Sequence, residues 1–95
     1  MQVLAHTPAA WFLLQHDASF YLDVNCTLSF SSLSVMIELN PEESARYQTE
    51  GRAYIDRLAD DIALRPREYY ARNNTVLNDA VSAAVQRWRS EGGAL

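Results

Sequence analysis

A segment from Asn40 to Leu64 constrains the fold of this chain more than any other feature. Asn40 can accept a hydrogen bond from the amides of a first helical turn, and Pro41 suits the first helical position because its φ is already set. Glu43 follows Asn40 by three residues, so its carboxylate can complete a capping box. The pattern predicts a helix that begins at Pro41.

An apolar stripe continues along this helix at helical spacing. Its members are Tyr47, Gly51, Tyr54, Ile55, Leu58 and Ile62. The helix should end at Leu64, because Pro66 disfavours helical geometry for the residue before it. Glycine inside a helix costs about 1 kcal/mol relative to alanine, so we interpret Gly51 as a point of close approach to a neighbouring element. The prediction is one long helix over 41–64 that lies on an apolar surface.

The residues before this helix alternate as strands do. One alternating set is Phe20, Leu22, Val24, Cys26, Leu28 and Phe30, and after two serines the pattern resumes with Leu33, Val35, Ile37 and Leu39. A hairpin about Ser31 and Ser32 would set Leu28 opposite Val35 and would place all the apolar side chains on one face. A four-residue loop over 30–33 preserves the same register.

A compact apolar run over 11–15 predicts an earlier strand, and the polar residues from His16 to Ser19 predict the turn after it. Residues 10–39 together predict a three-stranded antiparallel β-meander with one apolar face and one polar face. Residues 1–9 carry little pattern and include Pro8, so we expect a loose N-terminal arm there, with a short edge segment as the alternative.

The C-terminal third predicts a polar bridge over 65–74 and a last helix over 75–91. Asn73, Asn74 and Thr75 can each cap that helix, and Gly92-Gly93 can end it. Its apolar stripe consists of Leu77, Val81, Ala84, Val85 and Trp88. The expected fold class is therefore α+β with element order βββαα, in a single domain over 1–95. The long helix packs on one sheet face, and a second helix follows it.

Composition narrows the class of protein. The single cysteine, Cys26, cannot form an internal disulfide and lies on the apolar side of its strand, so we expect a buried thiol rather than a reactive one. Residues 1–10 lack the features of a signal peptide, and the apolar run over 11–14 is too short to span a membrane. The expectation is a cytoplasmic protein.

Charge argues against some partners. The net charge of −4 disfavours general affinity for nucleic acid or anionic lipid. All eight basic residues are arginine, which is typical of a GC-rich bacterial or phage genome. Selection for bidentate arginine contacts is the alternative explanation.

The chain contains no phosphate-binding loop, nucleophile elbow or metal-spaced pair of cysteines or histidines. We therefore expect no catalytic residue, no cofactor and no metal site. We expect that His6 and His16 neither act in catalysis nor bind a metal. Asp56, Asp60 and Asp61 gather on the outer side of the long helix. A solvated face with an ion pair from Arg57 to Asp61 explains them, and a patch for a cation or a basic partner is the alternative.

The segment from Arg65 to Arg72 has the composition of a recognition surface. Its expected partner-binding residues are Arg65, Arg67, Tyr69, Tyr70 and Arg72, which combine forked donors with rigid aromatic area. In the alternative, one tyrosine fills a gap between helices, while the arginines stay in water or pair with Glu68 and Asp61.

The polar sheet face is a second candidate surface. Its members are Tyr21, Asp23, Asn25, Thr27, Ser34, Met36 and Glu38. Such a face can simply meet water, or it can bind a partner or a second copy of the chain. It carries two acids and no arginine, which argues against stacking single-stranded RNA on it.

Together these patterns predict a small non-enzymatic interaction protein, such as a regulator, an inhibitor or an accessory subunit. We expect a protein partner or a homodimer, because an exposed edge strand and 48% apolar residues leave surface to be covered. Nucleic-acid binding through residues 65–72 is the alternative. A small enzyme without a recognisable motif is the third class.

Overall fold

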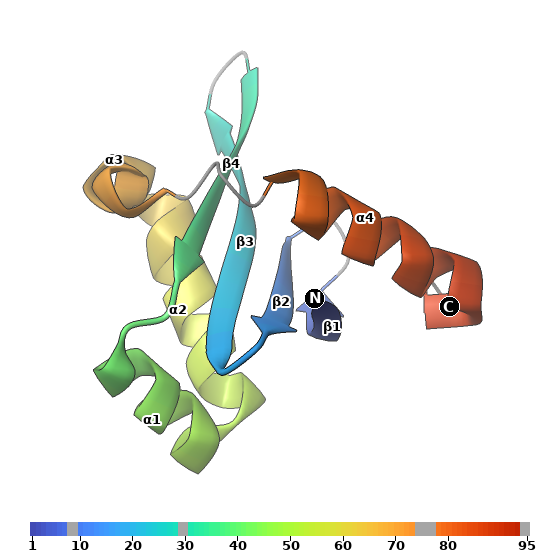
Figure 1. The fold of residues 1–95 in the computed structure, drawn as a ribbon. Helices are drawn as coiled ribbons and strands as arrows, with labels where there is room; N and C mark the ends of the chain where they lie inside the picture. Colours follow the sequence, from blue (N-terminus) through green and yellow to red (C-terminus); the bar gives the residue numbers. More distant parts are fainter. Residues whose placement is uncertain (8–9, 29–30, 74–77, 94–95) are drawn as a thin grey trace.

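The computed structural model describes residues 1–7, 10–28, 31–73 and 78–93, with the backbone alone for 26–28, 31–33, 78 and 93. In this part of the chain the strands β1 (Gln2–Thr7), β2 (Trp11–His16), β3 (Ser19–Leu28) and β4 (Ser31–Glu38) form one antiparallel sheet in chain order. The helices are α1 (Pro41–Glu50), α2 (Arg52–Leu64), α3 (Pro66–Tyr69) and α4 (Asn78–Trp88), with short helical turns η1 (Tyr70–Arg72) and η2 (Arg89–Gly93). Helices α1 and α2 lie on one side of the sheet and α4 on the other (Figure 1). The α+β class and the meander are confirmed, but the described chain has four strands and four helices rather than three and two.

The loose arm expected over 1–9 is wrong, and the alternative of a short edge segment is correct, because residues 2–7 form the edge strand β1 beside β2. The pairing shifts between Val3, which lies opposite Leu14, and Ala5, which lies opposite Leu13. This bulge sends the two side chains to opposite faces: Val3 packs under α4, and Ala5 packs on the α2 side. The alternation of side chains between the two sheet faces is therefore interrupted in mid-strand. A search for apolar residues at every second position misses β1 for this reason.

The hairpin of β3 and β4 is confirmed, but its predicted register is wrong. Leu28 lies opposite Ser31 rather than Val35, a difference of four residues (35 against 31), and Val24 takes the place opposite Val35. A shift by an even number keeps every side chain on its face, so alternation alone cannot choose between the two registers. The connection falls on residues 29–30, which lie outside the described residues. Cys26 pairs with Leu33, but its side chain is not described, so its burial stays a prediction.

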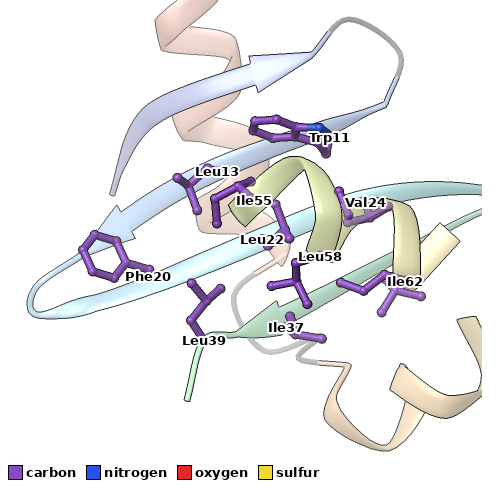
Figure 2. Packing of buried hydrophobic residues seen from close by; sticks show 12 residues of the cluster. Trp11, Leu13, Phe20, Leu22, Val24, Ile37, Leu39, Ile55, Leu58 and Ile62 are labelled. Atoms are coloured by element: carbon purple, nitrogen blue, oxygen red, sulfur yellow. The ribbon is translucent and has the colours of Figure 1, made fainter. Parts of the chain in front are cut away.

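The apolar sheet face carries the larger core cluster. Figure 2 shows Ile55, Leu58 and Ile62 of α2 lying over the strands. The buried members are Trp11, Leu13, Phe20, Leu22, Val24, Val35, Ile37, Leu39, Ile55, Leu58, Ala59 and Ile62. The predicted apolar stripe is thus confirmed for α2, while Tyr47 and Tyr54 pack at the margin of the cluster.

The helical segment begins as predicted. The Glu43 amide donates to Asn40 Oδ1 over 2.8 Å, and the Asn40 amide donates to Glu43 Oε1 over 2.9 Å. These two bonds form a complete capping box with Pro41 in the first turn. The start of α1 is therefore set by three residues of local sequence.

The prediction of one continuous helix over 41–64 is wrong, because the chain breaks at Gly51. This residue has φ 71° and ψ −148°, close to a region of backbone space that is essentially restricted to glycine. Its amide donates to the Tyr47 carbonyl oxygen over 2.7 Å and so closes α1. A Cβ atom at Gly51 would meet no atom within 4 Å, so the interpretation as close approach is also wrong. The backbone conformation is what requires glycine here.

The sheet face predicted as polar is covered in part by α4. A second core cluster lies there and consists of Leu14, Tyr21, Met36, Val81 and Ala84. The Tyr21 hydroxyl donates to Glu38 Oε1 over 2.9 Å, which satisfies its polar end. Tyr21 and Met36 therefore belong to the core and do not form an open surface.

Within the described residues the last helix runs from Asn78 to Trp88, and η2 follows it. Residues 74–77, which include two of the predicted caps and Leu77, lie outside the described residues. Gly92 has φ 91° within η2, consistent with its predicted role in ending the helix.

Strand β4 is an edge of the sheet, and the chain after α3 runs along it. Asn73 Oδ1 accepts a hydrogen bond from the Met36 amide over 2.9 Å. Arg72 Nη2 donates to the Glu38 carbonyl oxygen over 3.0 Å. The side chains of Arg72 and Asn73 thus form hydrogen bonds with backbone groups of this edge strand.

The opposite edge, at β1, also receives arginine side chains. Arg52 Nη2 donates to the His6 carbonyl oxygen over 2.9 Å and to Thr7 Oγ1 over 2.7 Å. Arg87 Nη2 donates to the Met1 carbonyl oxygen over 2.8 Å. Helices on both faces of the sheet therefore hold the first residues of the chain.

Candidate interaction surfaces

The predicted recognition segment folds into α3 and η1 and is tied to the end of α2. Tyr69 packs at the margin of the larger core cluster, and its hydroxyl donates to Asp61 Oδ2. Arg65 donates to the other oxygen of Asp61. Hydrogen bonds from Tyr69 and Arg65 hold the pKa of Asp61 below its usual range, and burial together with Asp61 raises the pKa of Tyr69 to about 12. Tyr69 and Arg65 thus anchor α3.

Arg72 joins the same segment to α1. Its Nη1 donates to Glu43 Oε2 over 3.0 Å, and its Nη2 donates to Glu43 Oε1, so the pair is bidentate. The Glu43 side chain is 13% exposed and also serves the capping box at Asn40. Burial opposes ionisation of Glu43, but the bonds from Arg72 and from the Asn40 amide hold its pKa below the usual range. The Arg72 guanidinium is therefore occupied in joining this segment to α1.

Arg65, Arg67 and Tyr70 are exposed, but only Arg67 and Tyr70 among these three have no side-chain hydrogen bond or ion pair within the described residues. Tyr70 is 43% exposed, and within the described residues no hydrogen bond or ion pair engages the exposed Arg67. Leu64, at the end of α2, is 80% exposed and lines a shallow hollow of about 350 Å³ together with Arg67. We call Leu64, Arg67 and Tyr70 the α3 surface. The sequence interpretation missed Leu64, although its position just before Arg65-Pro66, outside the helical stripe, was a usable signal.

Two acidic residues of α2 pair with different arginines: Asp56 with Arg52, and Asp61 with Arg65. The predicted pair from Arg57 to Asp61 is wrong, because Arg57 pairs with Glu50 and Asp61 pairs with Arg65. Pairs between exposed side chains of this kind add little stability.

A polar cleft opens between α4 and the sheet, with a volume of about 290 Å³. Its lining includes Phe12, Asp23, Asn25, Val85, Gln86 and Arg89. Asp23 is partly buried between two apolar cross-strand neighbours, Phe12 and Met36, and this burial raises the pKa of its carboxyl. The Arg89 guanidinium lies 5.9 Å from the centre of the Phe12 ring. Sequence alternation had placed Asp23 on the polar face, but the cleft exists only because α4 covers that face.

Both histidines have local partners. His6 stacks on Phe12 with ring centres 5.5 Å apart, and Trp88 meets His6 edge-on at 4.5 Å. His16 lies at the turn between β2 and β3, with its Nε2 3.6 Å from Asp17 Oδ2. This aromatic cluster packs the end of α4 against β1 and β2.

A third hollow of about 330 Å³ lies at the helix break, between Gly51, Trp11 and Leu13. Arg52 covers it, with its guanidinium 5.1 Å from the centre of the Trp11 ring. Because Arg52 also donates to His6, it is engaged in joining α2 to β1.

Within the described ranges, no three or more His, Cys, Asp or Glu side chains lie together in a way that could hold a metal ion. No helix of the described part combines the length and the apolar character needed to cross a bilayer. Comparison with models of known protein families, with curated proteins and with solved structures finds no match.

Proposed function

We propose that this chain is a small non-enzymatic protein-interaction module that binds through the α3 surface. The partner is another protein or a second copy of the chain in a homodimer. The observation that carries the proposal is the exposure of Leu64, at 80%, beside exposed Arg67 and Tyr70. An all-arginine basic set and a single cysteine support a regulator, inhibitor or accessory subunit of a bacterial or phage cytoplasm.

The surroundings of the α3 surface favour binding because they are already rigid. Tyr69 and Arg65 hold α3 against Asp61, and Pro66 is buried beneath it. Little order has to be imposed on these residues when a partner arrives, which lowers the entropic cost of association. Tyrosine and arginine are also the residue types that most often dominate binding energy at interfaces.

The partner should offer an apolar pocket for Leu64 and a hydrogen-bond acceptor or acid for Arg67. Tyr70 lies three residues after Arg67 in a helical turn, which places the two on neighbouring positions of one side. Leu64 and Arg67 line the same hollow. The α3 surface therefore presents one apolar, one aromatic and one cationic group to a single partner.

The test combines light scattering with capture from extract of the source cell. If the homodimer is correct, the mass should double with concentration, and Leu64→Asp should keep the chain monomeric. If the partner is another protein, wild-type chain should retain it, and Leu64→Asp or Tyr70→Ala should release it. Arg46→Ala, at an exposed arginine of α1, is the matched control and should change neither result. Wild-type behaviour of Leu64→Asp in both assays would refute the α3 surface.

Nucleic-acid binding by the same segment makes a different prediction. Arg65 and Arg72 are engaged by Asp61 and Glu43, so Arg67 is the segment's arginine open to a phosphate. One such contact contributes only about one unit to the slope with which log affinity falls as log salt concentration rises. Sub-micromolar binding of mixed-sequence RNA or DNA at about 150 mM salt, abolished by Arg67→Ala, would replace the protein-interaction proposal.

A further inference from the structure

The cleft between α4 and the sheet carries two opposite charges that do not meet. Asp23 lines it from β3, and Arg89 lines it from η2. Within the described residues, no ion pair joins Asp23 to Arg89, and no hydrogen bond or ion pair joins either side chain to another group. Each charge therefore faces the cleft without a partner of opposite sign.

In the described part of the chain, Asp23 lacks a partner of opposite charge, whereas the partly buried acids Glu43 and Asp61 have hydrogen-bonded partners. Glu43 is held by Arg72, and Asp61 is held by Arg65 and Tyr69. Asp23 has apolar cross-strand neighbours instead, and burial alone raises its pKa. A partly buried carboxylate without a partner is costly, and in natural proteins it commonly marks the place of a ligand group.

Arg89 is placed by an irregular part of the chain. It is the first residue of η2, where the helix widens after Trp88 and the backbone turns at Gly92. This wide turn with a left-handed glycine is a common way to end a helix, and it places Arg89 in the last turn beside the cleft. The Arg89 guanidinium lies over the Phe12 ring, which can hold it at the mouth of the cleft in the absence of an anion.

We propose that this cleft binds a small zwitterion of the α-amino acid class, with its ammonium group at Asp23 and its carboxylate at Arg89. A simple cation would be repelled by Arg89 and a simple anion by Asp23, so a ligand that carries both charges suits the cleft best. The volume of about 290 Å³ is at the small end of ligand pockets, which favours a single amino acid over a peptide. Phe12 and Val85 favour an apolar side chain.

The first experiment titrates the full chain with L-leucine and follows backbone amide resonances by NMR. Two analogues separate the charges: 4-methylpentanoate lacks the ammonium group, and 3-methylbutylamine lacks the carboxylate. Leucine should shift resonances of β3 and η2 in a saturable way, and each analogue should bind about tenfold more weakly or worse. An analogue that binds as well as leucine would overturn the zwitterion assignment. No saturable shift with leucine, valine or phenylalanine up to about 10 mM would overturn the site.

Two variants test the assigned contacts separately. In Asp23→Asn, leucine should lose its advantage over 4-methylpentanoate. In Arg89→Gln, it should lose its advantage over 3-methylbutylamine. Asp79→Asn is the control, because this exposed acid of α4 does not line the cleft. Asp23→Asn should also unfold at no lower temperature than wild type, since it removes an uncompensated charge, so loss of binding cannot be ascribed to unfolding. Unchanged leucine preference in both variants would refute the proposal.

Discussion

Replacing Gly51 by alanine should destabilise the protein even though there is room for the added methyl group. The added Cβ would meet no atom within 4 Å, so steric conflict with neighbours contributes nothing. The cost comes from φ 71° and ψ −148°, a conformation that costs a residue with a side chain about 1–3 kcal/mol. Alanine also restricts the unfolded chain, which returns about 0.4–1 kcal/mol. The expected net loss is therefore about 1 kcal/mol.

Urea denaturation, together with thermal unfolding, measures this loss. For a domain of this size, 1 kcal/mol corresponds to a fall of about 4–8 °C in Tm. Gly51→Leu should cost the same as Gly51→Ala within about 0.5 kcal/mol, because the strain is in the backbone and does not grow with the side chain. Thr49→Ala, at an exposed position of α1, is the control and should stay within about 0.5 kcal/mol of wild type.

Two results would refute this reasoning. If Gly51→Ala is neutral or stabilising, the helix does not break at this residue in solution. The predicted continuous helix over 41–64 would then be correct. If Gly51→Leu costs several times more than Gly51→Ala, the position is crowded, and close approach rather than backbone conformation requires the glycine.

Three further predictions concern the capping box and the anchor of α3. Asn40→Ala should lower the free energy of unfolding by about 1 kcal/mol, and an unchanged urea midpoint would contradict its role as cap. Because the pKa of Glu43 is lowered from 4.5, its charge stabilises the fold above that pH, and the stabilisation is lost as the pH falls through the folded value. The stability advantage of wild type over Glu43→Gln should accordingly be full at neutral pH and disappear in acid; a gap independent of pH would contradict the pair with Arg72. Tyr69→Phe should cost about 1 kcal/mol and remove one tyrosine that ionises near pH 12 in an ultraviolet titration, and a titration curve that keeps this component would contradict the bond to Asp61.

Local features of the fold were predictable because their causes lie within a few residues. The capping box at Asn40 needs only its own neighbours, and the apolar sets of β3 and α2 follow from their spacing. The break at Gly51 was missed because a glycine at a helical position is equally compatible with a break and with close packing. The signal for the break was the glycine itself, the least favourable helix residue after proline.

Features that depend on pairing between distant segments were not predictable. The register of β3 on β4 is ambiguous by any even shift, and the bulge at Val3 conceals β1. The recognition segment has the composition of a binding surface, yet Arg72 and Tyr69 are occupied by Glu43 and Asp61, which lie 29 and 8 residues away in sequence. Composition cannot reveal which arginines are already paired.

The side chains that reach the sheet edges have a consequence for how this chain can assemble. An unprotected edge strand is a template for strand addition, by which a foreign segment or a second copy extends the sheet. At β4, the Met36 amide already donates to Asn73 Oδ1 and the Glu38 carbonyl oxygen already accepts from Arg72, so an incoming strand would have to displace both side chains. Growth of a continuous intermolecular sheet, as in fibrils or edge-to-edge dimers, is thereby opposed at this border.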